Sequence, residues 1–273
     1  MSDGNEAGRV QTSLTALLRG TGNIVSGATS VVKDAVVTTL GNVGDVGSAI
    51  AGTASNIATG AFAAVNEVGT GAVRTAKGLV VGLLEGIGEI ATVTVGTVSD
   101  VVRAAIKGTG SIGADATATI GGIAEGVITA TKTTGVNLAD GAVTLGSSVI
   151  SGVKDLGTGA VATAAATVSG AINGAAQIGG DVLTVVTSTS KGLVQGAGSV
   201  GADIVDVTRG AISGAISGAK DLGLSVEDAA SAAATGAFQA AEAIGESAVH
   251  AVRDVAASGV GGVKAVIKGD QET

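Results

Sequence analysis

The sequence contains no proline, cysteine, tryptophan or tyrosine, and only two phenylalanines, one methionine and one histidine occur among its 273 residues. Without cysteine there are no disulfides, thiolate metal ligands or cysteine nucleophiles. A single histidine removes the usual zinc sites and most catalytic triads. Because large side chains are so scarce, the interior of a conventional globular enzyme is hard to build. We therefore expect a non-enzymatic protein with no catalytic residues, no metal site and no cofactor.

The chain is acidic: 15 Lys and Arg residues against 23 Asp and Glu residues give a formal charge of -8. Such a surface repels phosphate backbones, so we expect no nucleic-acid partner. The first ten residues include two acids and show no apolar stretch after a basic start, as a signal peptide would. The expected location is intracellular.

What the chain does contain is 47 glycines and 45% hydrophobic residues, most of them small, with only 14% charged. This composition is biased but is not typical of disorder. Every eleventh residue from Phe62 to Val260 forms a series in which sixteen of nineteen positions are Val, Ile, Leu or Phe. Chance would give about five. A second series, starting at Val46, keeps the same period.

Eleven residues in three turns correspond to about 3.67 residues per turn, close to the α-helical value. The apolar rows are separated by steps of three and four, which favours a helix over a β-solenoid with alternating side chains. We find no regular loop signal between the repeats. The predicted fold is therefore all-α: a long, nearly uninterrupted amphipathic helix, or a few long helices, built on eleven-residue repeats.

We divide the chain into a polar N-terminal tail (1–9), an amphipathic repeat region (10–220), an Ala-rich acidic helical segment (221–267) and a C-terminal tail (268–273). The boundary near 221 follows from Glu227 and Asp228, which interrupt the first apolar series and suit the first turn of a new helix.

The two series define an apolar face that we expect to lie against a lipid or other hydrophobic surface. Its members are Phe62, Val73, Leu84, Val95, Ile106, Ile128, Ile150, Val161, Ile172, Leu183, Val194, Val205, Ile216 and Phe238 in the first series, and Ile57, Val68, Leu79, Ile90, Val101, Ile112 and Ile123 in the second. Five cations lie at the border of this face, where a long stem can stay apolar while the charge remains in water: Lys77, Lys132, Lys154, Arg209 and Lys220.

Segments 70–79, 134–143 and 152–161 combine Val, Ala, Thr and Gly in a way that resembles the eleven-residue repeats of perilipin 4-type proteins and, more distantly, of synucleins. The resemblance lies in composition and period and covers most of residues 18–266. It implies a long helix that coats lipid droplets or vesicles. The synuclein-type repeat is richer in Lys, whereas residues 62–220 here carry nine Lys or Arg against eleven Asp or Glu. A neutral oil, a polyester granule or a weakly charged membrane is therefore the expected partner.

Two alternatives remain open. Small residues recur four apart, as in Gly78, Gly82 and Gly86, and such spacing lets helices approach closely, so copies of the chain could assemble into a scaffold or filament. A membrane-spanning segment is disfavoured, because the one long uncharged stretch, 156–180, is mostly Ala, Gly, Thr and Ser.

Overall fold

The computed structural model of the chain describes residues 3–19, 23–41, 46–68, 71–110, 116–154 and 159–269. These residues form twelve α-helices and no strand, so the prediction of an all-α protein is confirmed. The helices are α1 (Asp3–Arg19), α2 (Ile24–Leu40), α3 (Val46–Val68), α4 (Ala72–Ile90), α5 (Val95–Thr109), α6 (Ala116–Thr134), α7 (Leu138–Val153), α8 (Ala160–Ile178), α9 (Val182–Val200), α10 (Ile204–Asp221), α11 (Val226–Ile244) and α12 (Glu246–Ser258).

The prediction of a long uninterrupted helix, or of a few long helices, is wrong. The longest described helix, α3, has 23 residues, and most of the others have 15 to 19. Short connections separate them: residues 179–181 join α8 to α9, and residues 201–203 join α9 to α10. One helix and one loop, as from Gly179 to Gly201, therefore span two of the eleven-residue periods.

Two features of the sequence end one helix and start the next. Gly179 and Gly201 follow α8 and α9 with φ values of 68° and 70°, a left-handed conformation that costs an L-residue with a side chain about 1–2 kcal/mol. Two residues later, Asp181 and Asp203 cap the next helix by accepting hydrogen bonds from backbone amides of its first turn. The same three-residue pattern of a glycine, any residue and a cap occurs before α7, at 135–137, and before α11, at 223–225. These sites lie two helix–loop units before Gly179 and one after Gly201.

The chain divides into two compact units, residues 1–136 with α1–α6 and residues 137–273 with α7–α12. The boundary predicted near 221 falls at the loop between α10 and α11, inside the second unit.

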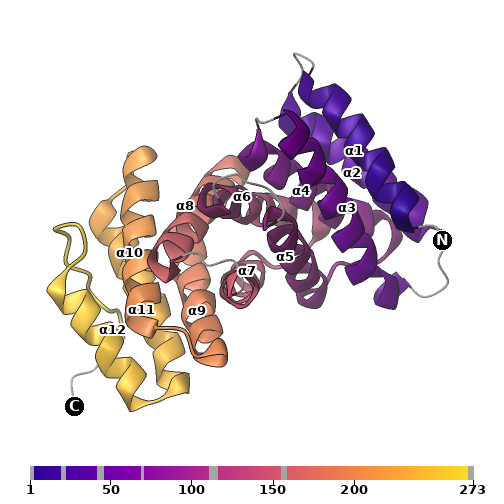
Figure 1. Ribbon diagram of the computed structural model, residues 1–273. Coiled ribbons are helices and arrows are strands. Elements are labelled where there is room, and N and C mark those ends of the chain that lie inside the picture. The colour runs from indigo at the N-terminus through magenta and orange to yellow at the C-terminus, as the bar shows by residue number, and fades with distance from the viewer. Residues whose placement is uncertain are drawn as a thin grey trace. The chain divides into compact units, whose positions relative to one another are not determined.

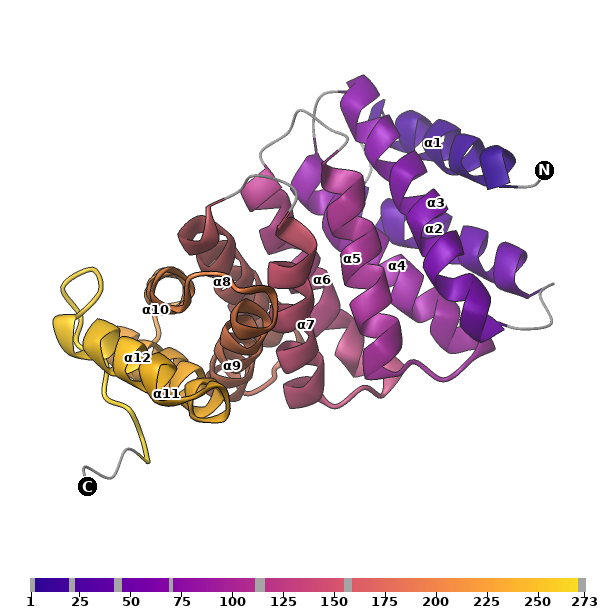
Figure 2. The same ribbon diagram turned by 60° about the horizontal axis from the view of Figure 1, so that its bottom comes forward.

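Within each unit, helices α1 to α11 pack most extensively on the helix two positions along the chain, whereas α12 packs mainly on α11. In the first unit α1, α3 and α5 follow one another in one layer, and α2, α4 and α6 form a second layer (Figures 1 and 2). In the second unit α7, α9 and α11 form one such row, and α8 packs on α10. Helices of one row run parallel, and a pair of helices is the repeat: 44 residues from α4 to α6 (72 to 116) and from α7 to α9 (138 to 182), and 48 from α2 to α4 (24 to 72).

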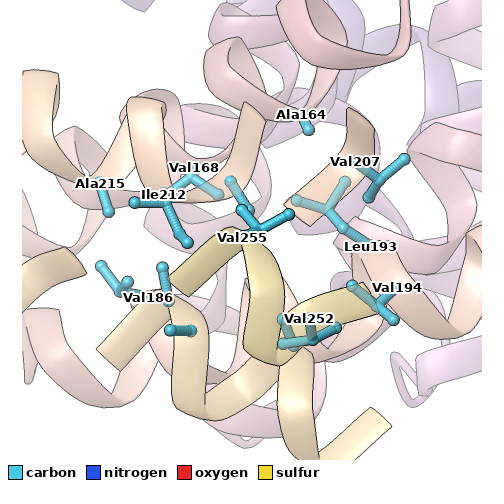
Figure 3. Packing of buried hydrophobic residues seen from close by; sticks show 14 of the residues in the cluster. Ala164, Val168, Val186, Leu193, Val194, Val207, Ile212, Ala215, Val252 and Val255 are labelled. Atoms are coloured by element: carbon cyan, nitrogen blue, oxygen red, sulfur yellow. The ribbon is translucent and has the colours of Figure 1, made fainter. Parts of the chain in front are cut away.

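The core of the second unit is built largely from Ala and Val side chains of α8–α12, with Val168, Ile212 and Val255 among those that meet between the helices (Figure 3). Phe238 is also buried in this core, and the guanidinium carbon of Arg253 lies 5.4 Å from the centroid of its ring. The small size of these side chains requires the helices to approach closely if the interior is to be filled.

Candidate functional site

The apolar face predicted from the eleven-residue period is the candidate functional surface, and in the folded chain most of it is buried. Twelve of its predicted members are less than 9% exposed: Phe62, Leu84, Ile106, Ile128, Ile150, Ile172, Val194, Phe238, Ile57, Leu79, Val101 and Ile123. Val161, Val205, Ile216 and Ile90 are partly buried, and Val73, Val95 and Leu183 are exposed. Ile112 and the side chain of Val68 lie outside the described residues.

The alternation between buried and exposed members has a simple cause. Each helix–loop unit contains two members of the first series, and they fall in turn at the middle and at the start of a helix. Ile172 and Val194 lie inside α8 and α9 and are fully buried in the core of the second unit. Leu183 is the second residue of α9 and is 40% exposed. The exposed members therefore mark helix starts and do not depart from the pattern.

Glycines allow the helices of a layer to approach one another closely. A side chain at Gly192 of α9 would collide with the backbone of Val143 on α7, and a Cβ at Gly196 would lie 2.9 Å from the Cα of Ser147. In the other row, Gly214 of α10 meets the backbone of Ala165 on α8 in the same way. The small-residue spacing seen in the sequence thus serves contacts between helices of one chain.

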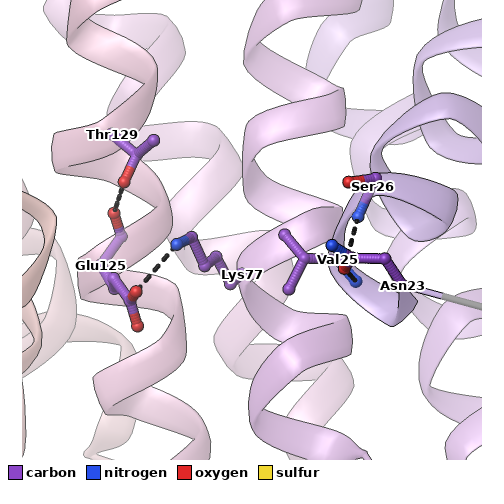
Figure 4. Close-up of polar contacts among 6 residues, drawn as sticks. All are labelled: Asn23, Val25, Ser26, Lys77, Glu125 and Thr129. Atoms are coloured by element: carbon purple, nitrogen blue, oxygen red, sulfur yellow. Dashed lines mark hydrogen bonds and ion pairs between the residues drawn. The ribbon is translucent and has the colours of Figure 1, made fainter. Parts of the chain in front are cut away.

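The predicted border cations have different surroundings. Lys77 on α4 is largely buried, and its Nζ donates to Glu125 Oε1 on α6 at 2.8 Å (Figure 4). Lys132, Lys154, Arg209 and Lys220 are exposed. Arg209 lies 3.6 Å from Asp206 on the same helix. The ammonium of Lys77 is thus directed to a carboxylate of the neighbouring helix, and the other four cations face outward.

A second charged contact joins α2 to α4. Lys33 Nζ lies 2.6 Å from Glu89 Oε1, and the hydrogen bond and negative charge of Glu89 raise the pKa of Lys33 above its ordinary value. Both side chains are substantially exposed, so solvent and salt weaken this pair. It helps to align the neighbouring helices and adds little to their stability.

Several buried hydroxyl groups weaken the packed form. Thr75, Thr189, Ser190 and Thr208 each have a buried hydroxyl oxygen without a hydrogen-bond partner among the described residues. Each such group costs about 1–3 kcal/mol compared with a hydrated hydroxyl. Two of these hydroxyls are adjacent in α9, Thr189, which belongs to the second apolar series, and Ser190.

A cleft of about 200 Å³ between α1 and α2 is lined by Arg9, Ser13, Asp34 and neighbouring small residues. In the described part of the chain, no three His, Cys, Asp or Glu side chains gather as metal ligands would. Nor does any described helix combine the length and hydrophobicity needed to span a bilayer.

Sequence reasoning missed the residues that end and cap the helices. The side chain of Asp181 accepts a hydrogen bond from the backbone amide of Thr184, and that of Asp203 accepts hydrogen bonds from the amides of Val205 and Asp206. The signal was present at every second period, because glycines recur at 135, 157, 179, 201, 223 and 245. A search for a period of eleven residues misses this series of glycines. The positions midway between them hold glycine only once, at 146.

The chain matches no known protein family, and no curated protein is detectably similar to it. The resemblance to perilipin 4-type and synuclein-type repeats therefore remains an expectation based on composition and period.

Proposed function

We propose that this protein is a non-enzymatic amphipathic-helix protein that coats a lipid or other hydrophobic surface inside the cell, such as an oil droplet, a polyester granule or a membrane, and stabilises it. The observation that carries the proposal is that, in the described residues, the apolar faces of the helices are covered by other parts of the same chain. In the surface-bound form, the helices separate and these faces meet the surface instead of each other.

The geometry of the repeat supports this exchange. Within a helix each eleven-residue period makes three whole turns, so if the glycine loops also became helical in the surface-bound form, each successive helix would present its apolar face at the same angle. Ile150 in α7 and Ile172 in α8 illustrate this, because they hold the same place in successive units. Opening at the glycine loops would allow all the faces to lie on one plane without any change in helix phase.

The energetics of the packed form point the same way. Its interior consists mainly of Ala, Val and Gly, and it encloses hydroxyls that lack a partner among the described residues. The glycines inside the helices add a cost of up to about 1 kcal/mol each compared with Ala. A hydrophobic surface that covers the apolar rows returns about 25 cal/mol per Å² of apolar area, so little net free energy opposes opening.

The charge distribution favours a neutral surface. The exposed border cations are offset by acidic residues along the helices, and the whole chain carries -8. Attraction to anionic headgroups is therefore small, and binding should depend weakly on salt.

Reversible disulfide cross-links between helices test the proposal. Because the chain has no cysteine of its own, no other thiol competes with the introduced pairs. An ideal Cβ at Gly196 lies 3.3 Å from Ile150 Cβ, and one at Gly218 lies 3.3 Å from Ile172 Cβ. These separations are close to the range of about 3.5–4.5 Å found in disulfides. The variant Ile150→Cys/Gly196→Cys/Ile172→Cys/Gly218→Cys would join α7 to α9 and α8 to α10 when oxidised.

We expect the reduced form of this variant to float with a triolein emulsion and the oxidised form to stay in the aqueous phase. The reduced form, in which the new Cβ atoms crowd the contacts of Gly196 and Gly218, is the control for composition, and the unmodified chain is the control for the four substitutions themselves. Equal flotation of the two forms would show that helix separation is not needed and would overturn the proposal.

The second candidate function is a self-assembling helical scaffold, favoured by the close glycine contacts between helices of a layer, such as Gly214 against Ala165. Sedimentation of the chain without lipid separates the two. A scaffold forms large particles in buffer alone, whereas a coat protein stays dispersed until oil is added.

A further inference from the structure

The segment that follows α12 turns back onto α11. Val260 and Val263 exchange backbone hydrogen bonds of 2.9 and 3.0 Å in a tight reversal. The chain then runs along α11, where the amide of Val266 donates to Ser231 Oγ and the amide of Lys268 donates to Thr235 Oγ1, both at 3.0 Å. We refer to residues 263–268 as the C-terminal cap.

The cap is held by alternate side chains. Val263, Ala265 and Ile267 pack against the core of the second unit, whereas Lys264, Val266 and Lys268 point outward, with Val266 68% exposed. A period of two is typical of an extended segment with one covered side. The cap thus covers part of α11 with one row of apolar side chains and two backbone hydrogen bonds.

The part of α11 under the cap has equivalents in other helices of its row. Thr187 and Lys191 on α9 lie one helix pair, 44 residues, before Ser231 and Thr235. The backbone of α9 at Thr187 and Lys191 is in close contact with Gly236 of α11. One helix pair before α9, the backbone of α7 at positions 143 and 147 is in the same close contact with the glycines of α9 at positions 192 and 196. On α7 and α9 this face receives the next helix of the row, whereas on α11 it receives the cap.

The first helix of the chain offers the matching side. Gly60 of α3 meets the backbone of Ala7, 53 residues earlier, whereas Gly192 and Gly236 meet residues 49 positions earlier, so α1 lies 48 residues before α3 and Thr12 holds the repeat position of Gly60. Ala16, one turn later, holds the repeat position of Gly196. In α3, α9 and α11 this repeat position faces the preceding helix of the row, whereas on α1 Thr12 and Ala16 are exposed.

We propose that the Ser231–Thr235 face of α11 is a docking site for α1 of a second copy of this chain, and that the C-terminal cap closes it. When the cap lifts, copies add head to tail and continue the helix row with the same glycine-to-backbone interface. Such a heterologous contact generates an open series and not a closed dimer. This inference rests on the repeat geometry and is independent of the proposed surface binding.

The test compares two full-length variants with the same change in net charge. Ala265→Asp/Ile267→Asp places charges on the covered side of the cap and releases it. Lys264→Ala/Val266→Asp changes only its outward side. Both are compared with the unmodified chain by sedimentation velocity over a range of concentrations. Far-UV circular dichroism checks the helix content, and amide exchange at positions 266 and 268 reports whether the cap is attached.

We expect the unmodified chain and the outward variant to sediment as single chains of 25.5 kDa. The inward variant should lose protection at both amides and form oligomers whose mass rises in whole multiples with concentration. Adding Ala16→Glu to the inward variant should restore the single chain.

Three results would overturn the proposal: an unmodified chain that already oligomerises, an inward variant that keeps its helices and stays a single chain, or oligomers that persist with Ala16→Glu. Retained amide protection in the inward variant would also contradict it, because the cap would then not be held by Ala265 and Ile267.

Discussion

Lys77 on α4 and Glu125 on α6 lie on neighbouring helices of one layer and form an ion pair of 2.8 Å, with side chains only 13% and 19% exposed. The ion pairs of Lys33 with Glu89 and of Arg209 with Asp206 are about one-third or more exposed on both sides. The Lys77–Glu125 pair therefore fixes the alignment of α4 and α6 from a position that water reaches poorly.

Removing one member of this pair should cost more than removing both. Glu125→Gln leaves the Lys77 ammonium poorly solvated, and we expect a loss of about 2 kcal/mol in the free energy of unfolding. Lys77→Met/Glu125→Gln should recover at least half of that loss. Urea denaturation of the two single variants and the double variant measures the coupling. Additive losses would show that the two side chains act independently.

Glycine contacts should be essential where helices touch and dispensable elsewhere. A Cβ at Gly82 of α4 would lie 2.6 Å from the carbonyl oxygen of Thr29 on α2, whereas nothing lies within 4 Å of one at Gly52 in α3. Gly82→Ala should therefore lower the free energy of unfolding by about 2 kcal/mol through overpacking. Gly52→Ala should raise it by about 0.5–1 kcal/mol, because Ala is the better helix former. Thermal unfolding of both variants checks the opposite signs.

The helix caps should make stability depend on acidity. Hydrogen bonds from the Thr184 side chain and backbone lower the pKa of Asp181 below its ordinary value of 3.8. A lowered folded-state pKa adds stability above the unfolded-state value, and this stability is lost as the pH falls through the folded-state pKa. Asp181→Ala should thus cost about 1 kcal/mol at pH 7 and less at pH 2. Denaturation at both pH values measures the difference; an equal cost would contradict the charged cap.

Leu183 separates the folded form from the proposed surface-bound form. It belongs to the apolar series but is 40% exposed, while Leu224, outside both series, is 44% exposed. Leu183→Ser and Leu224→Ser should each change stability by no more than about 0.5 kcal/mol. If the opened helices lie on a surface, only Leu183→Ser should weaken flotation with oil. A similar effect of both substitutions would argue that binding does not use the eleven-residue face.

The sequence predicted the helical conformation and an apolar face, but it did not predict the path of the chain. Ile57, Ile123 and Ile172 were assigned to one apolar face, and all three are buried. The period specifies which side of a helix is apolar, but neighbouring helices and a surface can cover that side equally well. Which of them covers it depends on the loops. Their glycines recur at every second period and preserve the helical phase, so no shift in register reveals them.

The pairing of helices also lay beyond the sequence. Gly192 and Gly196 indicated that something approaches α9 closely, but the same spacing suits a neighbour in the chain or another molecule. The identity of α7 as that neighbour requires knowledge of loop length and of the alternation between layers.

The two-layer stack restricts how such a chain can change in length. A helix packs mainly on the helices two positions before and after it in the chain. Deletion of residues 160–203 would therefore bring α10 to the place of α8 and α11 to the place of α9. Gly236 would then meet Val143, as Gly192 does now. Deletion of a single helix with its loop would transfer every later helix to the opposite layer and separate each glycine from its backbone partner. Heritable gains and losses of repeats should therefore come in pairs of helices.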